Sequence, residues 1–155
     1  MRMSDFVVRD AIIPDLAAVN KEGVIREMAG SLCAAGCFRE GDKEDVVRAI
    51  LKRELLGSTG IGNGIAIPHG KLPKLARLFG MFARLDRPID FEALDGQPVD
   101  LIFLLLAPEP AGADHLKALA RVARLMRTPD TAKMLRDSRD AEAIYAVLTR
   151  SSTGG

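Results

Sequence analysis

Apolar residues recur along the chain in two patterns, and each pattern predicts a different kind of element. Over residues 21–35, 42–56 and 114–126 the apolar side chains return every three or four positions, which is typical of helices with one buried face. The same spacing predicts a short helix over 132–136 and a last helix that ends near 148. Continuous apolar runs over 78–85 and 99–107 indicate strands buried on both faces, and we expect a further strand over 15–19.

Residues that favour helix ends and turns separate these elements. Asn20 is placed to cap the first helix, and Asp42 opens the second, with Asp45 in the position of the acidic member of a capping box. Either Ser138 or Asp140 can start the last helix. The stretches 87–90 and 95–98 combine proline, aspartate and glycine, so we predict turns there.

Helices and strands alternate along the chain, which predicts an α/β fold. A length of 155 residues is most simply one domain. We therefore predict a single-domain layered fold over residues 1–150, with a mixed central sheet flanked by helices, and a flexible tail over 151–155.

Composition narrows the classes of function. The chain is 48% apolar and 28% charged, with a formal net charge of +1, so bulk charge does not favour a nucleic-acid partner. Aromatic residues make up 5% and tryptophan is absent, which argues against stacking on single-stranded nucleic acid. The most apolar run, 101–107, is too short to cross a bilayer, and no apolar segment follows the first residues. We expect a cytoplasmic protein with no membrane insertion.

One stretch, residues 58–72, combines unusual backbone chemistry with a single histidine. Gly60, Gly62 and Gly64 alternate, and His69 follows a proline and precedes a glycine. We expect a shaped loop, a short strand and a histidine displayed at the end of that strand. The glycine spacing is wrong for a dinucleotide fingerprint, and no serine or threonine follows Lys71 as a P-loop requires.

The chain has two histidines, His69 and His115, and two cysteines, Cys33 and Cys37. Two histidines make a poor catalytic zinc site, which usually has three protein ligands. The cysteines are four residues apart on a predicted helix, so we interpret them as small apolar residues. We expect no metal and no cofactor.

The segment 58–70 resembles the phosphorylation-site signature of the enzyme IIA component, fructose–mannitol class, of the bacterial phosphotransferase system. The segments 97–101 and 115–116 support the resemblance, which extends over nearly the whole chain and is closest to the nitrogen-related branch. Residues 1–150 would then be an EIIA type-2 domain. The resemblance implies that His69 accepts a phosphoryl group at Nε2, and that His115 and Arg53 are the second histidine and the arginine of the active site.

The resemblance also implies partners. The donor would be a histidine-containing carrier, HPr or its paralogue NPr, and the phosphorylation state would regulate target proteins, such as potassium-transport or kinase proteins in relatives. Two alternatives remain open at this stage. One is a sugar-specific EIIA that passes phosphate to a IIB domain in fructose or mannitol uptake, and the other is a binding module with a degenerate site.

The chemistry of these residues suits phosphoryl transfer. Imidazole is largely neutral at cytoplasmic pH, and a backbone carbonyl bonded to one ring nitrogen would fix the tautomer. A phosphorylated histidine carries roughly two negative charges, which Arg53 and a hydrogen bond from His115 can stabilise. Two questions stay open: Thr59 offers either a hydroxyl to the site or a turn, and Lys117, Arg121 and Arg124 form either a solvated helix face or a docking rim near His115.

Overall fold

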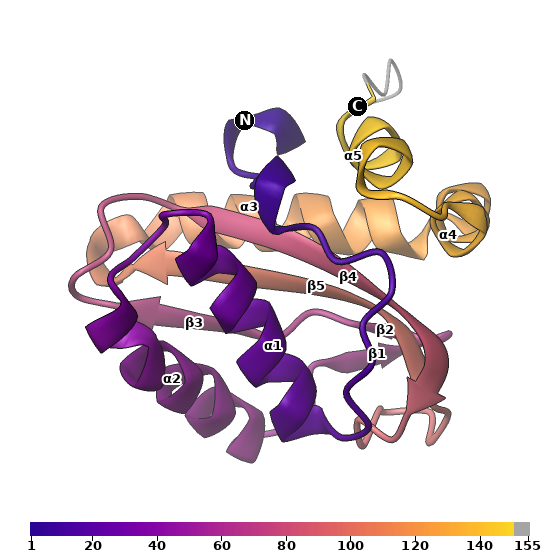
Figure 1. Ribbon diagram of the computed structural model, residues 1–155, viewed down its shortest axis with the longest axis horizontal. Coiled ribbons are helices and arrows are strands. Elements are labelled where there is room, and N and C mark those ends of the chain that lie inside the picture. The colour runs from indigo at the N-terminus through magenta and orange to yellow at the C-terminus, as the bar shows by residue number, and fades with distance from the viewer. Residues whose placement is uncertain (151–155) are drawn as a thin grey trace.

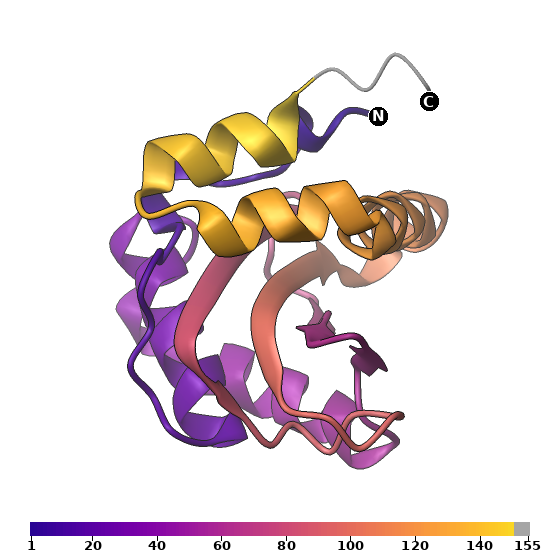
Figure 2. The ribbon, with the colours of Figure 1, turned by 90° about the vertical axis from the view of Figure 1, so that its right-hand side faces the viewer.

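A central sheet separates two layers of helices in the computed structural model, which describes residues 1–150 (Figure 1). Helices α1 (Lys21–Ala34) and α2 (Lys43–Leu55) cover one face. Helices α3 (Gly112–Arg127), α4 (Pro129–Asp137) and α5 (Ala141–Thr149) lie on the other face, together with the N-terminal segment (Figure 2). The predicted fold class, a mixed sheet flanked by helices, is confirmed.

The sheet is built around β5 (Val99–Pro108), which pairs along one edge with the antiparallel strand β4 (Phe79–Ile89). Its other edge takes two short parallel strands in succession, β2 (Ile65–Ala66) and β3 (His69–Leu72). Strand β1 (Gly60–Gly62) pairs antiparallel with β2. Between β2 and β3 the oxygen of Pro68 accepts a hydrogen bond from Leu105 N at 3.0 Å, so the extended chain stays alongside β5 up to His69.

Strand β5 is buried on both faces because successive side chains point to opposite sides of the sheet. Ile102, Leu104 and Leu106 pack into the core beneath α1 and α2. Leu101, Phe103 and Leu105 pack into a second core beneath α3, α4 and α5. The continuous apolar run is therefore a strand buried on both faces, as predicted from the sequence. The last four residues of β5 pair with β3, with Leu105 opposite His69.

The predicted helix starts are largely confirmed. Asn20 Oδ1 accepts a hydrogen bond from Gly23 N at 2.8 Å, and Asp140 Oδ1 accepts one from Ala143 N at 2.8 Å. Asp140, not Ser138, starts the last helix. The prediction of a capping box for α2 is wrong. Asp42 has helical angles (φ −95°, ψ −5°) at the end of a 3-10 turn, and its side chain makes no capping hydrogen bond.

Two strand predictions need correction. Residues 15–19 do not form a strand; instead Val7 and Ile13 make isolated bridges to the outer edge of β4, separated by the 3-10 turn Arg9–Ala11. Strand β4 continues to Ile89 through the stretch predicted as a turn at 87–90. Its register with β5 shifts between Arg84 and Ile89, and an irregularity of this kind accommodates Pro88, which cannot donate to a neighbouring strand.

Two further predictions from the sequence concern membrane insertion and the C-terminal tail. Among residues 1–150 no helix is long and apolar enough to cross a bilayer. The predicted flexible tail, residues 151–155, lies outside the described residues.

Candidate functional site

The glycine-rich stretch folds into a tight hairpin and not into an open loop. Gly60 and Gly62 belong to β1, and the turn into β2 places Asn63 at φ 57° and Gly64 at φ 79°. A Cβ on Gly64 would lie 2.6 Å from Arg136 Nη2 and 2.7 Å from Asp100 Oδ1, so this position needs glycine. The hairpin leads directly to β3, and His69 begins that strand instead of ending one as predicted.

One ring nitrogen of His69 is engaged by the chain itself. Nδ1 lies 2.8 Å from the carbonyl oxygen of Ile67, two residues earlier. A carbonyl oxygen can only accept, so Nδ1 carries the proton and Nε2 keeps its lone pair. The expectation of a backbone carbonyl is met, and the acceptor is the oxygen of Ile67.

His115 lies beside His69, as the fourth residue of α3. The two ring centroids are 5.6 Å apart and the planes make an angle of 76°. His115 is 3% exposed, and its Nδ1 is buried without a hydrogen-bond partner among the described residues. An unpaired buried N–H is costlier than an unpaired acceptor, which favours the tautomer that carries its proton on Nε2.

Arg53 comes from the last turn of α2, and its side chain reaches past the helix end. Its Nη1 donates to the oxygen of Gly57 at 2.9 Å. Arg53, His69 and His115 line one hollow of about 420 Å³. The structure thus brings together the end of a helix, the start of a strand and the first turn of another helix.

The sequence of this chain also matches a known protein family. Residues 5–151 match the family described as "Phosphoenolpyruvate-dependent sugar phosphotransferase system, EIIA 2". The chain belongs to this EIIA family. It is a phosphotransferase-system EIIA component, as the sequence resemblance implied.

Individual relatives agree with the EIIA assignment. The chain is 59% identical over 148 residues to a nitrogen regulatory protein of Bradyrhizobium diazoefficiens, covering 96% of this chain and 95% of that protein. The crystal structure of the nitrogen regulatory protein IIA-Ntr from Neisseria meningitidis superposes with a TM-score of 0.87 at 33% identity, covering 95% of this chain and 99% of that one. A fructose-specific EIIABC component of Bacillus subtilis is 35% identical over 150 residues, covering 97% of this chain and 23% of that protein.

Both histidines of this EIIA chain have lowered pKa values. Burial is the main cause of the lowered pKa of His69; the charge of Arg53 lowers it further, while the Ile67 carbonyl and Glu54 act in the opposite direction. Burial, His69 and Lys71 lower the pKa of His115 to about 4. Both rings are therefore mostly neutral at pH 7.

The effect of Arg53 on the pKa of His69 can be tested by mutation. Arg53→Gln is expected to raise this pKa, because the nearby positive charge disfavours the imidazolium form. An NMR titration of the His69 ring measures the change, with Arg48→Gln, an exposed arginine of the same helix, as control. An unchanged His69 pKa in Arg53→Gln would show that the guanidinium does not act on the ring.

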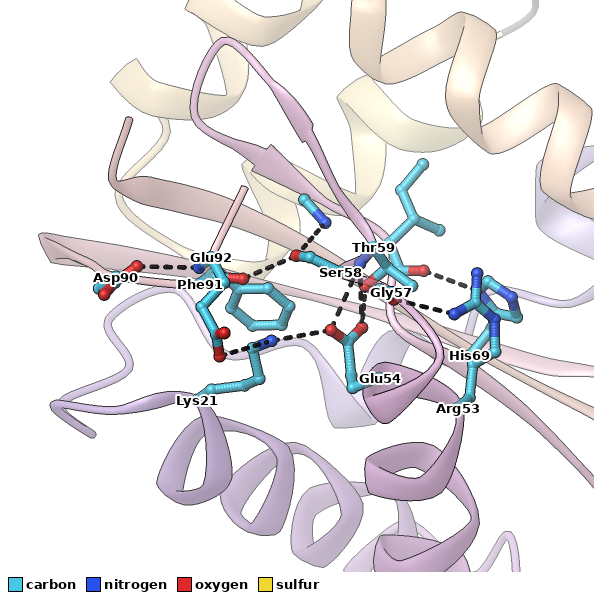
Figure 3. A network of polar contacts seen from close by, with 12 residues as sticks. Lys21, Arg53, Glu54, Gly57, Ser58, Thr59, His69, Asp90, Phe91 and Glu92 are labelled. Atoms are coloured by element: carbon cyan, nitrogen blue, oxygen red, sulfur yellow. Dashed lines mark hydrogen bonds and ion pairs between the residues drawn. The ribbon is translucent and has the colours of Figure 1, made fainter. Parts of the chain in front are cut away.

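Sequence reasoning missed the role of Glu54, which holds the turn between α2 and β1. Its carboxylate accepts hydrogen bonds from Thr59 N, from the Thr59 hydroxyl and from Lys21 Nζ (Figure 3). Glu54 is 7% exposed although it is charged. The available signal was a carboxylate on the apolar stripe of a helix, four residues after the buried Ile50.

The Glu54 turn is connected to His69 through the backbone. Thr59 O accepts a hydrogen bond from Ile67 N at 3.0 Å, and Ile67 O in turn holds the His69 ring. The same turn supplies Gly57 O to Arg53. Because its hydroxyl is bonded to Glu54, Thr59 serves the turn and does not point into the hollow.

The remaining polar candidates lie elsewhere. A different hollow from the one that holds the histidines is lined by Lys117, Arg121 and Arg124. These three residues therefore do not form the rim of the histidine hollow. Cys33 and Cys37 are free and partly buried. Within residues 1–150, no three histidine, cysteine or acidic side chains gather closely enough to bind a metal.

Proposed function

We propose that this EIIA protein is a histidine phosphocarrier of the nitrogen-related phosphotransferase system. It takes a phosphoryl group from an HPr- or NPr-type carrier and regulates target proteins through its phosphorylation state. The observation that carries the proposal is the hydrogen bond from His69 Nδ1 to Ile67 O, which leaves Nε2 as the nucleophile in a hollow shared with His115 and Arg53. The nitrogen regulatory proteins among its relatives favour this branch.

The transfer needs no proton to move at His69. The Nε2 lone pair forms a bond to phosphorus while the bond from phosphorus to the carrier's histidine breaks, and that imidazole leaves with its electron pair. The proton of His69 stays on Nδ1, where Ile67 O stabilises the positive charge that develops on the ring.

Two groups in the hollow suit the phosphorylated product. A guanidinium such as that of Arg53 stabilises phosphoryl oxygens, and the Nε2–H of a neutral His115 donates a hydrogen bond. Lys52 and Lys71 also line the hollow and add positive charge. Since the product gains roughly two negative charges, the cations around it lower its free energy.

The surroundings of the hollow fit a protein partner. Leu56 and Leu116 line it and are 84% and 69% exposed, so two large apolar side chains face solvent beside the histidines. A carrier that docks there would bury them and bring its phosphohistidine to His69. The same surface changes charge on phosphorylation, so a target protein can bind one phosphorylation state in preference to the other.

A reconstituted transfer reaction tests the proposal. The EIIA protein is incubated with phosphoenolpyruvate, the enzyme that phosphorylates the carrier, and either HPr or NPr, and its mass is measured intact. The expected result is one phosphoryl group per chain, stable to alkali and labile to acid. Absence of phosphorylation with both carriers would favour the binding module with a degenerate site.

A second function has specific support, because the Bacillus subtilis relative named for fructose contains a matching segment. A sugar-specific EIIA would pass its phosphoryl group to a IIB domain. A strain that lacks this protein separates the two functions. A growth defect confined to fructose or mannitol would support the sugar-specific function, and normal growth on both sugars would support the regulatory one.

His115→Ala is expected to slow phosphorylation of His69 by roughly 100- to 1,000-fold without preventing it, the range seen when one donor to a transition state is removed. The acceptor nitrogen remains, but one hydrogen bond to the phosphoryl oxygens is lost. Single-turnover transfer from the phosphorylated carrier measures the rate. A rate equal to that of the wild type would show that His115 only fills space.

A further inference from the structure

A second hollow lies on a different side of α3 from the histidines. It has a volume of about 520 Å³ and is lined by the N-terminal segment, α3, the start of α4 and the end of α5. These segments come together on one side of the molecule in Figure 2, and they contact one another. The volume falls within the range of about 300–1,000 Å³ found for small-molecule sites.

The charged side chains that line this hollow are all positive. Its lining contains four cationic side chains, Lys117, Arg121, Arg124 and Arg150, and no carboxylate. Within the described part of the chain, none of the four forms an ion pair, although nine other lysines and arginines do, among them Arg9 and Arg136. Because the whole chain has a net charge of only +1, the excess is local.

One of these cations is already held in place. Arg150 Nη2 donates to Thr131 Oγ1 at 2.9 Å, and Nη1 approaches Met134 Sδ at 3.0 Å. Thr131 is 2% exposed, so its side chain is a fixed support for the guanidinium. A positioned guanidinium loses less conformational entropy when it binds an anion.

We propose that this hollow binds a small molecule that carries at least two phosphate groups and an apolar part. Four cations without opposing charges match the phosphates, since guanidinium and ammonium groups form charge-assisted hydrogen bonds to phosphate oxygens. The buried side chains of Met3 and Leu148 and the partly buried Leu125 line the same hollow and match the apolar part. The proposal does not depend on phosphorylation of His69.

The shape and composition of the hollow favour a small molecule over an acidic protein. Protein interfaces present exposed apolar and aromatic side chains at their centre. The strongly exposed Leu56 and Leu116 lie at the histidine hollow. The lining here combines the recessed Met3 and Leu148 with one exposed large apolar side chain, Met1 at 45%. A concave surface with cations around a recessed apolar floor suits a ligand that enters it.

NMR titration of the full chain with tripolyphosphate and with ATP tests the proposal. We expect the amide signals of Thr131 and Leu148 to shift, and ATP to bind more tightly than tripolyphosphate because its base and ribose contact the apolar floor. The double variant Arg121→Gln/Arg124→Gln should weaken binding by about tenfold or more, since two charge-assisted contacts are lost. Lys117→Gln gives an independent test with one charge removed.

The control is Arg127→Gln, an exposed arginine of the same helix that does not line the hollow, and its affinity should stay within about twofold of the wild type. Equal weakening by Arg127→Gln would reveal general attraction of polyanions and would overturn the proposal. Absence of shifts at millimolar ligand, or tighter binding of tripolyphosphate than of ATP, would also contradict it. His69→Ala should bind normally, so failure of the proposed phosphocarrier function would not be confused with failure of this site.

Discussion

Replacing His69 with alanine is expected to abolish phosphorylation of the chain while leaving its fold intact. Nε2 of His69 is the only nucleophile that the proposed transfer uses, and its lone pair is kept available by the bond from Nδ1 to Ile67 O. The other histidine cannot replace it, because His115 is 3% exposed and its Nδ1 is enclosed. Intact-mass measurement after incubation with phosphorylated carrier should detect no phosphoryl group.

Two controls separate chemistry from folding in the His69 experiment. His115→Ala should still become phosphorylated, although slowly, and thermal unfolding of His69→Ala should be cooperative like that of the wild type. A phosphoryl group on His69→Ala would remove the assignment of the acceptor. Loss of cooperative unfolding in this variant would show instead that the ring is needed for the fold.

Glu54→Ala is expected to lower the free energy of unfolding by about 3 kcal/mol or more, the range seen when one partner of a buried ion pair is removed. The side chains of Glu54 and Lys21 are 4% and 16% exposed, and their charged atoms are 3.0 Å apart. Without the carboxylate, the Lys21 ammonium and the backbone N–H of Thr59 lose a buried partner. Chemical denaturation measures the loss.

The variant should also slow phosphoryl transfer, because the turn held by Glu54 supplies Gly57 O to Arg53 and Thr59 O to the strand before His69. Glu44→Ala is the matched control: Glu44 lies in the same helix and pairs with Arg26, but both are exposed, so its loss should cost at most about 1 kcal/mol. If Glu54→Ala were no less stable than Glu44→Ala, the buried network would not hold the turn. Glu54→Gln, which keeps the shape and one acceptor, should fall between the two.

Local patterns accounted for most of the elements. The helix starts at Asn20 and Asp140 were predictable because a side-chain oxygen can bond to a free N–H within the same turn, and this interaction does not depend on the rest of the fold. The buried strand β5 was predictable because a long apolar run needs protein on both faces. The failures at 15–19 and 87–90 involve the edge of β4, where pairing depends on what lies next to it.

The sequence by itself determined the family, the α/β class and the three candidate residues, because these rest on local spacing and on a contiguous segment around His69. Only the tertiary structure decided that Ile67 O holds the His69 ring, that His115 lies 5.6 Å from it, and that Glu54 supports the turn beside Arg53. It also separated Lys117, Arg121 and Arg124 from the histidines, although they follow His115 on the same helix. The physical reason is that such contacts join residues on different elements, or on different faces of one helix, and only packing against the sheet sets which of them meet.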